Sequence, residues 1–220
     1  MSINSIVDKL SKKDNHDILY SNEYINYGLV DKSPRHRNAL SKTMKTGCKV
    51  LDELGVKYWL GRGSVLGFHR ENGFLPNDID IDIDLVGDKD IYRIFQKLPF
   101  ELLLVTICNG RHQQCAFIDP ETNVIFDIWM YHGNDSGVMI NRNYYGYFWL
   151  PEILQDNLAT YCLEGRNYII PNPEWYCDFW YGENWRTPKS YGDDWSIDYR
   201  NDCKGFTYTG LTNLVVTNYY

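Results

Sequence analysis

The chain has 220 residues, of which 44% are hydrophobic and 23% are charged, so it can bury one substantial core as an ordinary globular protein. Its formal net charge of −7 excludes a surface built mainly for nucleic acid, because binding to a phosphate backbone requires clustered Lys and Arg. No stretch approaches the roughly 20 apolar residues that cross a bilayer, and the N-terminus lacks a signal-peptide pattern, so we expect a cytoplasmic protein without a transmembrane segment.

The chain begins with a polar segment, which a helix and a strand follow. Residues 1–35 are interrupted by Asp, Asn, Ser and Pro34, and we expect them to form an N-terminal arm or leader. From 36 to 54, apolar residues recur at three- and four-residue steps, which predicts an amphipathic helix that Gly55 can end. Residues 56–60 include β-branched and aromatic side chains, which predicts a short buried strand.

A glycine-containing turn and a short helix come next. The sequence Gly-Arg-Gly-Ser at 61–64 ends the strand, and residues 65–70 predict a short helix with Ser64 at or near its N-cap. Small residues before a helix let backbone N–H groups approach phosphate oxygens, and the helix dipole favours negative charge there. We therefore interpret Gly63 and Ser64 as a phosphate cradle, although a Gly-Ser pair on its own more often marks only a turn.

The segment 79–86 carries a strict alternation of apolar and acidic side chains, which predicts a β-strand. Alternate side chains of a strand share a face, so the isoleucines should point into the core and the acids should share the opposite face. These acids are Asp78, Asp80, Asp82 and Asp84. Their clustered charge favours a bound cation, and ligand sets made only of acidic oxygens suit Mg²⁺ or Mn²⁺. The alternative is an acidic edge strand that deters aggregation.

The middle of the chain predicts one more helix and three strands. Residues 88–98 return to helical spacing, and apolar strands are predicted at 101–108, 113–118 and 124–130. The last two strands form a plausible hairpin, because turn residues separate them. This order of elements predicts an α+β fold in which helices flank a mixed sheet.

Asp127 is an acid inside the otherwise apolar strand at 124–130. An unpaired carboxylate would be costly there. A third carboxylate beside the aspartate strand would complete a metal site or accept the proton of a nucleophile. The alternative is a strand-end aspartate that pairs with an arginine.

Beyond residue 134, Gly, Asn, Tyr and Trp become frequent, and long periodic segments stop. A strand that ends at its proline is predicted at 168–171, and a short helix is predicted at 173–181.

The Gly-Ser turn, the aspartate strand and the later strand acid together resemble the pattern of the nucleotidyltransferase superfamily. The finer resemblance is to the LicD–fukutin family of phosphotransferases, and it runs from about residue 36 to residue 188. It is carried by YWLGRGSVLGFHR at 58–70, GFLP at 73–76 and FDIW at 126–129, with support from short motifs between 164 and 188.

This resemblance implies a polymerase-β-type core and the transfer of a phosphorylated alcohol, such as phosphocholine or ribitol phosphate, from a CDP-linked donor onto a glycan. It implies that Asp80, Asp82 and Asp127 are the catalytic acids and bind the metal ion, Mg²⁺ or Mn²⁺. The sequence departs from the family pattern at Ile79, which interrupts acids that are commonly adjacent. The alternating series of aspartates, from Asp78 to Asp84, also extends beyond the two expected ligands, so Asp78 and Asp84 stay open as alternative metal ligands.

Residues beside the predicted cradle complete the expected substrate site. We expect Arg62, His69 and Arg70, with Gly63 and Ser64, to bind the phosphates of the substrate. The alternative for the three basic residues is a place on a helix surface or a partner in the sheet. The C-terminal aromatic residues that could shape an acceptor groove, or simply pack in the core, are Tyr181, Trp185 and Trp195.

We therefore divide the chain into an N-terminal arm (1–35), a nucleotidyltransferase-like catalytic core (36–135) and an aromatic-rich C-terminal extension (136–220). The extension is expected to pack on the core and to complete the acceptor site. Two other functions stay open: transfer of a nucleotidyl group to a small molecule or a protein, and a catalytically silent glycan-binding module.

Overall fold

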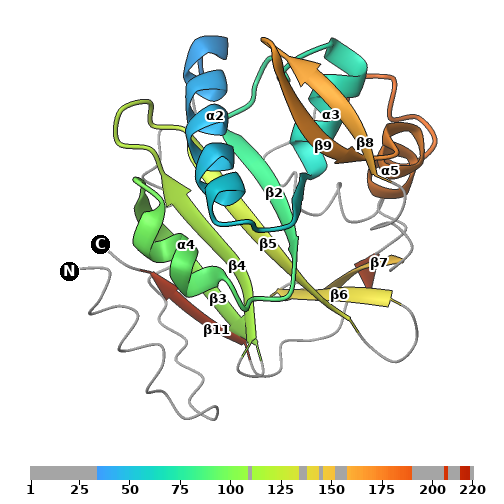
Figure 1. The fold of residues 1–220 in the computed structure, drawn as a ribbon. Coiled ribbons are helices and arrows are strands. Elements are labelled where there is room, and N and C mark those ends of the chain that lie inside the picture. The colour runs from blue at the N-terminus through green and yellow to red at the C-terminus, as the bar shows by residue number, and fades with distance from the viewer. Residues whose placement is uncertain are drawn as a thin grey trace.

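The structure, a computed structural model, describes residues 34–108, 111–133, 138–143, 146–151, 158–189, 206–207 and 214–218. In this part of the chain a large mixed sheet has helices on one face and at one side (Figure 1). The predicted N-terminal arm lies outside the described residues except for its last two positions, and the predicted domain boundaries stay predictions.

Nine described strands form the sheet. They are β1 (Tyr58–Leu60), β2 (Asp80–Val86), β3 (Glu101–Cys108), β4 (Arg111–Ile118), β5 (Ile125–Gly133), β6 (Val138–Asn143), β7 (Gly146–Pro151), β10 (Phe206–Thr207) and β11 (Leu214–Asn218). β2 and β5 run parallel, and the other pairs in this sheet are antiparallel. The predicted mixed sheet and the predicted hairpin of β4 and β5 are thereby confirmed.

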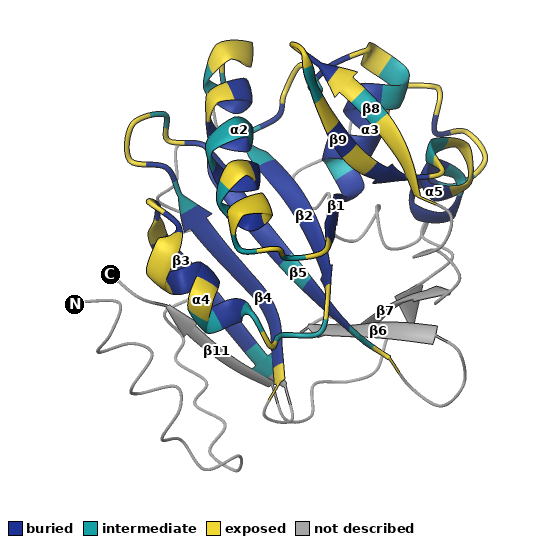
Figure 2. Cartoon of the chain, viewed as in Figure 1, coloured by how far each residue is buried: buried dark blue, intermediate teal, exposed yellow. Residues whose placement is uncertain are grey.

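Two helices, α2 (Arg37–Glu53) and α4 (Ile91–Lys97), cover one face of the sheet (Figure 1). α2 lies so close to β5 that a Cβ on Gly47 would sit 2.4 Å from the ring of Phe126. Ile81 and Ile83 of β2 are fully buried in the same core, and the central strands are buried along most of their length (Figure 2). Because side chains alternate along a strand, the aspartates of β2 project from the opposite face, as the sequence predicts.

α3 (Arg62–Glu71) begins three residues earlier than predicted, and Ser64 is not its N-cap. Gly61 takes the N-cap position and makes no side-chain capping bond. The Ser64 hydroxyl instead accepts the backbone N–H of Asp82 at 3.1 Å, because β2 lies against this turn. A tertiary contact has therefore replaced the local capping bond on which the prediction relied.

The C-terminal described part contains a hairpin and a helix at the side of the sheet (Figure 1). α5 (Pro173–Tyr181) coincides with the predicted helix and packs against α3. β9 (Arg166–Pro171) contains the predicted strand and pairs with β8 (Leu158–Leu163), which the sequence reasoning missed because β8 is largely exposed. Among the described residues we find no helix with the length and apolar character that crossing a membrane requires.

Candidate active site

The turn at the start of α3 is fastened to Asp82 by three hydrogen bonds. The Gly63 N–H donates to Asp82 Oδ2 at 3.1 Å, and the Asp82 N–H donates to Ser64 Oγ at 3.1 Å. The Gly61 N–H also donates to the Asp82 carbonyl at 3.0 Å. The structure therefore brings together the predicted cradle and one predicted catalytic acid, and it fixes the orientation of the Asp82 carboxylate.

Asp127 lies directly beside Asp82, because the two residues are partners in the parallel register of β2 and β5. Asp127 Oδ2 accepts a hydrogen bond from Gln114 Nε2 at 2.8 Å, which leaves Oδ1 buried and without a hydrogen-bond partner among the described residues. Asp78 Oδ2 is buried and unpartnered in the same sense. Since buried carboxylate oxygens are costly to leave unsatisfied, these two atoms indicate a place for a missing partner.

The four acids on this part of the sheet repel one another. Burial, followed by the charge of Asp82, raises the pKa of both Asp78 and Asp127 to about 8. Burial, followed by the charges of neighbouring aspartates, raises the pKa of Asp80 and Asp82 well above the ordinary value. Such a group cannot be fully ionised without a compensating cation.

The donor set fits a hard divalent cation in its chemistry. Carboxylate oxygens are the ligands that Mg²⁺ and Mn²⁺ prefer, and two of them here lack hydrogen-bond partners among the described residues. Within the described ranges, however, no three His, Cys, Asp or Glu side chains already converge as a metal site requires. Asp80, Asp82 and Asp127 could hold such an ion only after their carboxylates turned toward a common point.

Asp84 lies in a different environment from the other aspartates of the alternating series, Asp78, Asp80 and Asp82. Arg62 Nη1 donates to its Oδ1 at 3.0 Å and the Tyr176 hydroxyl donates to its Oδ2 at 2.9 Å. Burial raises the pKa of Asp84, and the charge of Arg62 opposes that rise. The structure thus places the Arg62 guanidinium in a buried ion pair, and its contact with a substrate phosphate stays a prediction.

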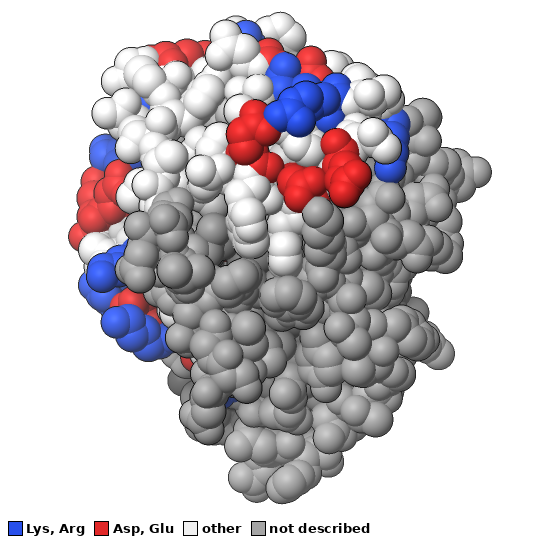
Figure 3. Space-filling view, turned by 90° about the vertical axis from the view of Figure 1, so that its right-hand side faces the viewer, with Lys and Arg blue, Asp and Glu red and all other residues white. Residues whose placement is uncertain are grey.

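The other predicted basic residues, His69 and Arg70, lie on the last turn of α3 and bond toward α5 and the segment after it. His69 Nε2 lies 2.9 Å from Glu174 Oε1, and Arg70 Nη1 donates to the Trp185 carbonyl at 3.1 Å. Acidic and basic side chains lie next to one another on the described part of this face (Figure 3). Their predicted contact with phosphate is untested by these bonds and stays a prediction.

The aromatic residues expected at an acceptor groove are divided by the structure. Tyr181 is buried at the end of α5, where burial, followed by the charge of Asp82, raises its pKa well above the ordinary value. Trp185 is buried and packs on His69, with 5.0 Å between the ring centroids. Trp195 lies outside the described residues.

Three residues of the site were missed by the sequence reasoning: Gln114, Tyr176 and Tyr131, whose hydroxyl accepts a hydrogen bond from Arg62 Nη2 at 3.0 Å. Gln114 left a weak signal, because it is a polar side chain inside the strand predicted at 113–118. The two tyrosines left none, since nothing local distinguishes them among the 18 tyrosines of the chain.

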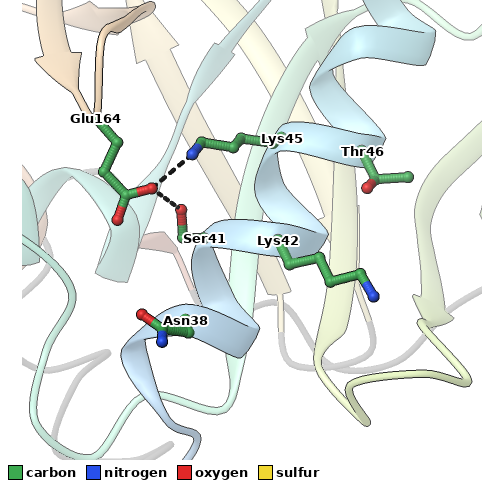
Figure 4. A pocket seen from close by; sticks show the side chains of 6 residues that line it. All are labelled: Asn38, Ser41, Lys42, Lys45, Thr46 and Glu164. Atoms are coloured by element: carbon green, nitrogen blue, oxygen red, sulfur yellow. Dashed lines mark hydrogen bonds and ion pairs between the residues drawn. The ribbon is translucent and has the colours of Figure 1, made fainter.

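A separate hollow of about 360 Å³ lies between α2 and the turn of the β8–β9 hairpin. There Glu164 accepts hydrogen bonds from Ser41 at 2.5 Å and Lys45 at 2.6 Å, both on α2 (Figure 4). Lys42, on the same helix, pairs with Glu121. Because both lysines already pair with glutamates, this hollow is a weaker candidate for the active site than the cluster of Asp78, Asp80, Asp82 and Asp127.

Comparison with known proteins places this site in a family. The family model for the LicD/FKTN/FKRP nucleotidyltransferase domain matches residues 55–173, which is more than half of the chain and includes all the acids of the site.

Two curated proteins are similar over shorter stretches. The mouse (Mus musculus) ribitol-5-phosphate transferase FKTN is 31% identical over 83 residues, which cover 36% of this chain and 18% of that protein. The uncharacterised protein RP689 of Rickettsia prowazekii is 36% identical over 74 residues, which cover 33% of this chain and 27% of that protein. The chain thus spans less than a third of the length of the curated relatives it matches.

Among solved structures, the lincosamide antibiotic adenylyltransferase LnuA superposes with a TM-score of 0.46 at 16% identity, over 73% of this chain and 94% of that chain. The family match covers the Gly-Ser turn, the aspartate strand and the Asp127 strand, whose geometry is described above. The resemblance inferred from these motifs is thereby confirmed, and the chain belongs to the LicD/FKTN/FKRP family and contains its nucleotidyltransferase domain.

Proposed function

We propose that this protein is a metal-dependent transferase that moves a phosphorylated alcohol from a CDP-linked donor to a hydroxyl of a glycan. The observation that carries the proposal is the fastening of the Gly63–Ser64 turn to Asp82, directly beside Asp127 on the neighbouring strand. The activity for which the mouse relative is named, transfer of ribitol 5-phosphate, supports a phosphorylated alcohol as the transferred group.

Asp80, Asp82 and Asp127 are the residues that would hold the metal ion. A bound Mg²⁺ or Mn²⁺ supplies neutralisation of the negative charge on the donor phosphates. The chain itself positions these ligands: the turn holds Asp82, and Gln114 holds one oxygen of Asp127. Two carboxyls held on adjacent strands keep their spacing while the donor binds.

The reaction that fits this site is a single displacement at phosphorus. The acceptor hydroxyl oxygen forms a bond to the phosphorus that carries the alcohol, and the bond from that phosphorus to the bridging oxygen breaks. CMP leaves with the electron pair of the broken bond. Asp127 Oδ1, which has no hydrogen-bond partner among the described residues, takes the proton of the acceptor hydroxyl.

The polar groups of the turn have a second role in this proposal. The Gly63 N–H and the Ser64 hydroxyl now bond to Asp82, so contact with a donor phosphate requires them to exchange partners when the donor binds. Arg62, His69 and Arg70 are proposed to lie around the phosphates only as secondary contacts, because each already has a protein partner.

Product analysis tests the reaction directly. The protein is incubated with Mg²⁺, a glycan acceptor and a panel of CDP- and UDP-linked alcohols and sugars, and the nucleotide products are separated. Release of CMP is expected. Release of pyrophosphate from a nucleoside triphosphate would instead establish nucleotidyl transfer, and absence of nucleotide binding by calorimetry would leave only a silent binding module.

Variants test the assigned residues. Asp80→Ala and Asp82→Ala are each expected to lower kcat by about 10²- to 10³-fold, the loss typical of removing one group that stabilises transition-state charge. Asp90→Ala is the matched control, because Asp90 is an acid at the N-terminus of α4 that pairs with Arg93. Unchanged turnover in both Asp80→Ala and Asp82→Ala would overturn the proposed metal-binding role of these two aspartates.

A further inference from the structure

A buried arginine lies next to the acid face. The Arg62 residue is 7% exposed, and its guanidinium carbon lies 3.7 Å from the ring centroid of Trp129. Arg62 Nη1 donates to Asp84 Oδ1 and Nη2 donates to the Tyr131 hydroxyl, each at 3.0 Å. These contacts come from β2 and β5, the two strands that also carry the predicted metal ligands.

Tyr176 connects the backbone of this arginine to the same carboxylate. Its hydroxyl accepts the Arg62 backbone N–H at 3.0 Å and donates to Asp84 Oδ2 at 2.9 Å. Both carboxylate oxygens of Asp84 therefore accept hydrogen bonds. One bond comes from the Arg62 side chain, and the other comes from the Tyr176 hydroxyl that also binds the Arg62 backbone. α5 thereby closes a ring of hydrogen bonds on the first residue of α3.

The ring holds a turn that would not adopt this shape unaided. Arg62 has φ = 38°, in the left-handed region that a side chain rarely adopts. The turn also presses against Asp84, since a Cβ on Gly61 would lie 2.7 Å from Asp84 Oδ2. The next residue, Gly63, donates its N–H to Asp82. The turn is thus held by Asp84 on one side and orients Asp82 on the other.

We propose that Asp84, Arg62 and Tyr176 are positioning residues: they hold the 61–64 turn in the conformation that orients Asp82. This inference rests on the proposed function, because it takes Asp82 to be a metal ligand. It assigns to Asp84 a role as the buried partner of Arg62, and it assigns to Tyr176 a role that reaches the site from the C-terminal helix.

Tyr176→Phe tests the proposal with the least disturbance. It removes only the hydroxyl that joins Asp84 to the Arg62 backbone. The aromatic ring of residue 176, whose centroid lies 5.9 Å from that of Trp180, is kept. Tyr58→Phe is the matched control, because the buried Tyr58 also donates its hydroxyl to an aspartate, Asp52, at 3.1 Å.

The first readout is amide hydrogen exchange of the metal-free protein, which needs neither substrate nor cation. The Gly63 and Asp82 amides are expected to exchange at least about tenfold faster in Tyr176→Phe than in the wild type, because local opening frees them. In Tyr58→Phe their exchange is expected to stay within about twofold of the wild type. Equal exchange in all three proteins would overturn the positioning role.

The second readout is calorimetric titration with Mn²⁺ alone, followed by steady-state kinetics. Tyr176→Phe is expected to weaken Mn²⁺ binding and lower kcat by about tenfold or more, as loss of a group that orients a ligand does, with little change in the donor KM. A raised donor KM with unchanged Mn²⁺ binding would instead show that Tyr176 supports donor binding and not the orientation of Asp82, and would overturn the proposal.

Asp84→Asn separates positioning from a direct metal contact by Asp84, because it keeps the shape of the side chain and removes its charge. It is expected to change both readouts at least as much as Tyr176→Phe does, and the double variant should be no worse than the poorer single one. If Asp84→Asn abolishes Mn²⁺ binding while Tyr176→Phe leaves it intact, Asp84 is a ligand and the proposal fails.

The failure of the two proposals can be distinguished. If the wild-type protein binds no Mn²⁺, the proposed metal dependence is contradicted. The amide exchange of Gly63 and Asp82 in Tyr176→Phe still decides whether the hydrogen bonds among Arg62, Asp84 and Tyr176 hold the 61–64 turn.

Discussion

The two halves of β2 carry the same residue type on the same face but differ in their surroundings. Asp80 and Asp82, in the first half, lie among other carboxylates, and burial together with those charges raises their pKa although the charge of Arg62 acts to lower it. Asp84, two residues further along, binds Arg62 at 3.0 Å and is fully buried. Alternation therefore decides which face of the sheet a carboxylate occupies, while the neighbouring elements decide whether its charge is neutralised.

The largest expected loss of stability from a single substitution comes from Asp84→Asn. It leaves the buried Arg62 guanidinium without its anion, which is expected to lower the free energy of unfolding by about 3–5 kcal/mol. Urea denaturation measures the change. Asp80→Asn is the control from the same face of the same strand, and it is expected to cost nothing or to stabilise, since it relieves repulsion. An equal loss in both variants would contradict the difference between the two halves.

A divalent cation is expected to stabilise the protein through the first half of β2. Mg²⁺ at a hundredfold excess over its dissociation constant should raise the free energy of unfolding by about 2.7 kcal/mol, because it binds only the folded state. Thermal unfolding with and without Mg²⁺ measures the effect. The gain should vanish in Asp82→Ala and persist in Asp90→Ala, whose carboxylate pairs with Arg93 on α4. A gain that survives in Asp82→Ala would place the cation elsewhere.

The pH dependence of stability tests the carboxylate cluster around Asp82 without any ligand. Asp127, on β5, is the strand partner of Asp82 in this cluster. The pKa of Asp127 is about 8 in the folded protein against an ordinary value of 3.8, so the folded state holds this proton more tightly than the unfolded state. Its contribution is therefore present below pH 4 and is lost as the pH rises toward 8, at up to about 1.4 kcal/mol per pH unit. Asp127→Asn should flatten this fall in chelator-treated protein, as followed by urea denaturation. An unchanged slope would contradict the raised pKa.

The smallest effect is expected at Asp88, which lies just beyond β2 and faces a histidine in place of other acids. Burial opposes the shift, but hydrogen bonds from the His112 ring and backbone N–H lower the pKa of Asp88 to about 2. The stability it contributes is thus present above pH 4 and is lost as the pH falls toward 2. Asp88→Asn should cost about 1 kcal/mol at neutral pH, and the cost should disappear at pH 2. A cost that persists in acid would show that charge is not its source.

Much of the fold could be predicted from local patterns. The helix predicted at 36–54 is observed as α2 (Arg37–Glu53), and the hairpin of β4 and β5 was predicted from two apolar runs and their turn. The β8–β9 hairpin was only half predicted, because β8 has no buried alternating face. Its turn at Glu164 and Gly165 depends on two positive φ angles, 50° and 79°, that composition alone does not reveal.

The alternating pattern of 79–86 was sufficient to predict a strand with its acids on one face, because side-chain direction in a strand follows from sequence spacing alone. The motifs around it were sufficient to identify the family. Only the tertiary structure shows that Asp82 lies beside Asp127 and that Asp84 lies against Arg62, since these contacts depend on strand pairing and on α5. The pKa of each aspartate follows from those neighbours and from burial, and no local sequence pattern encodes either.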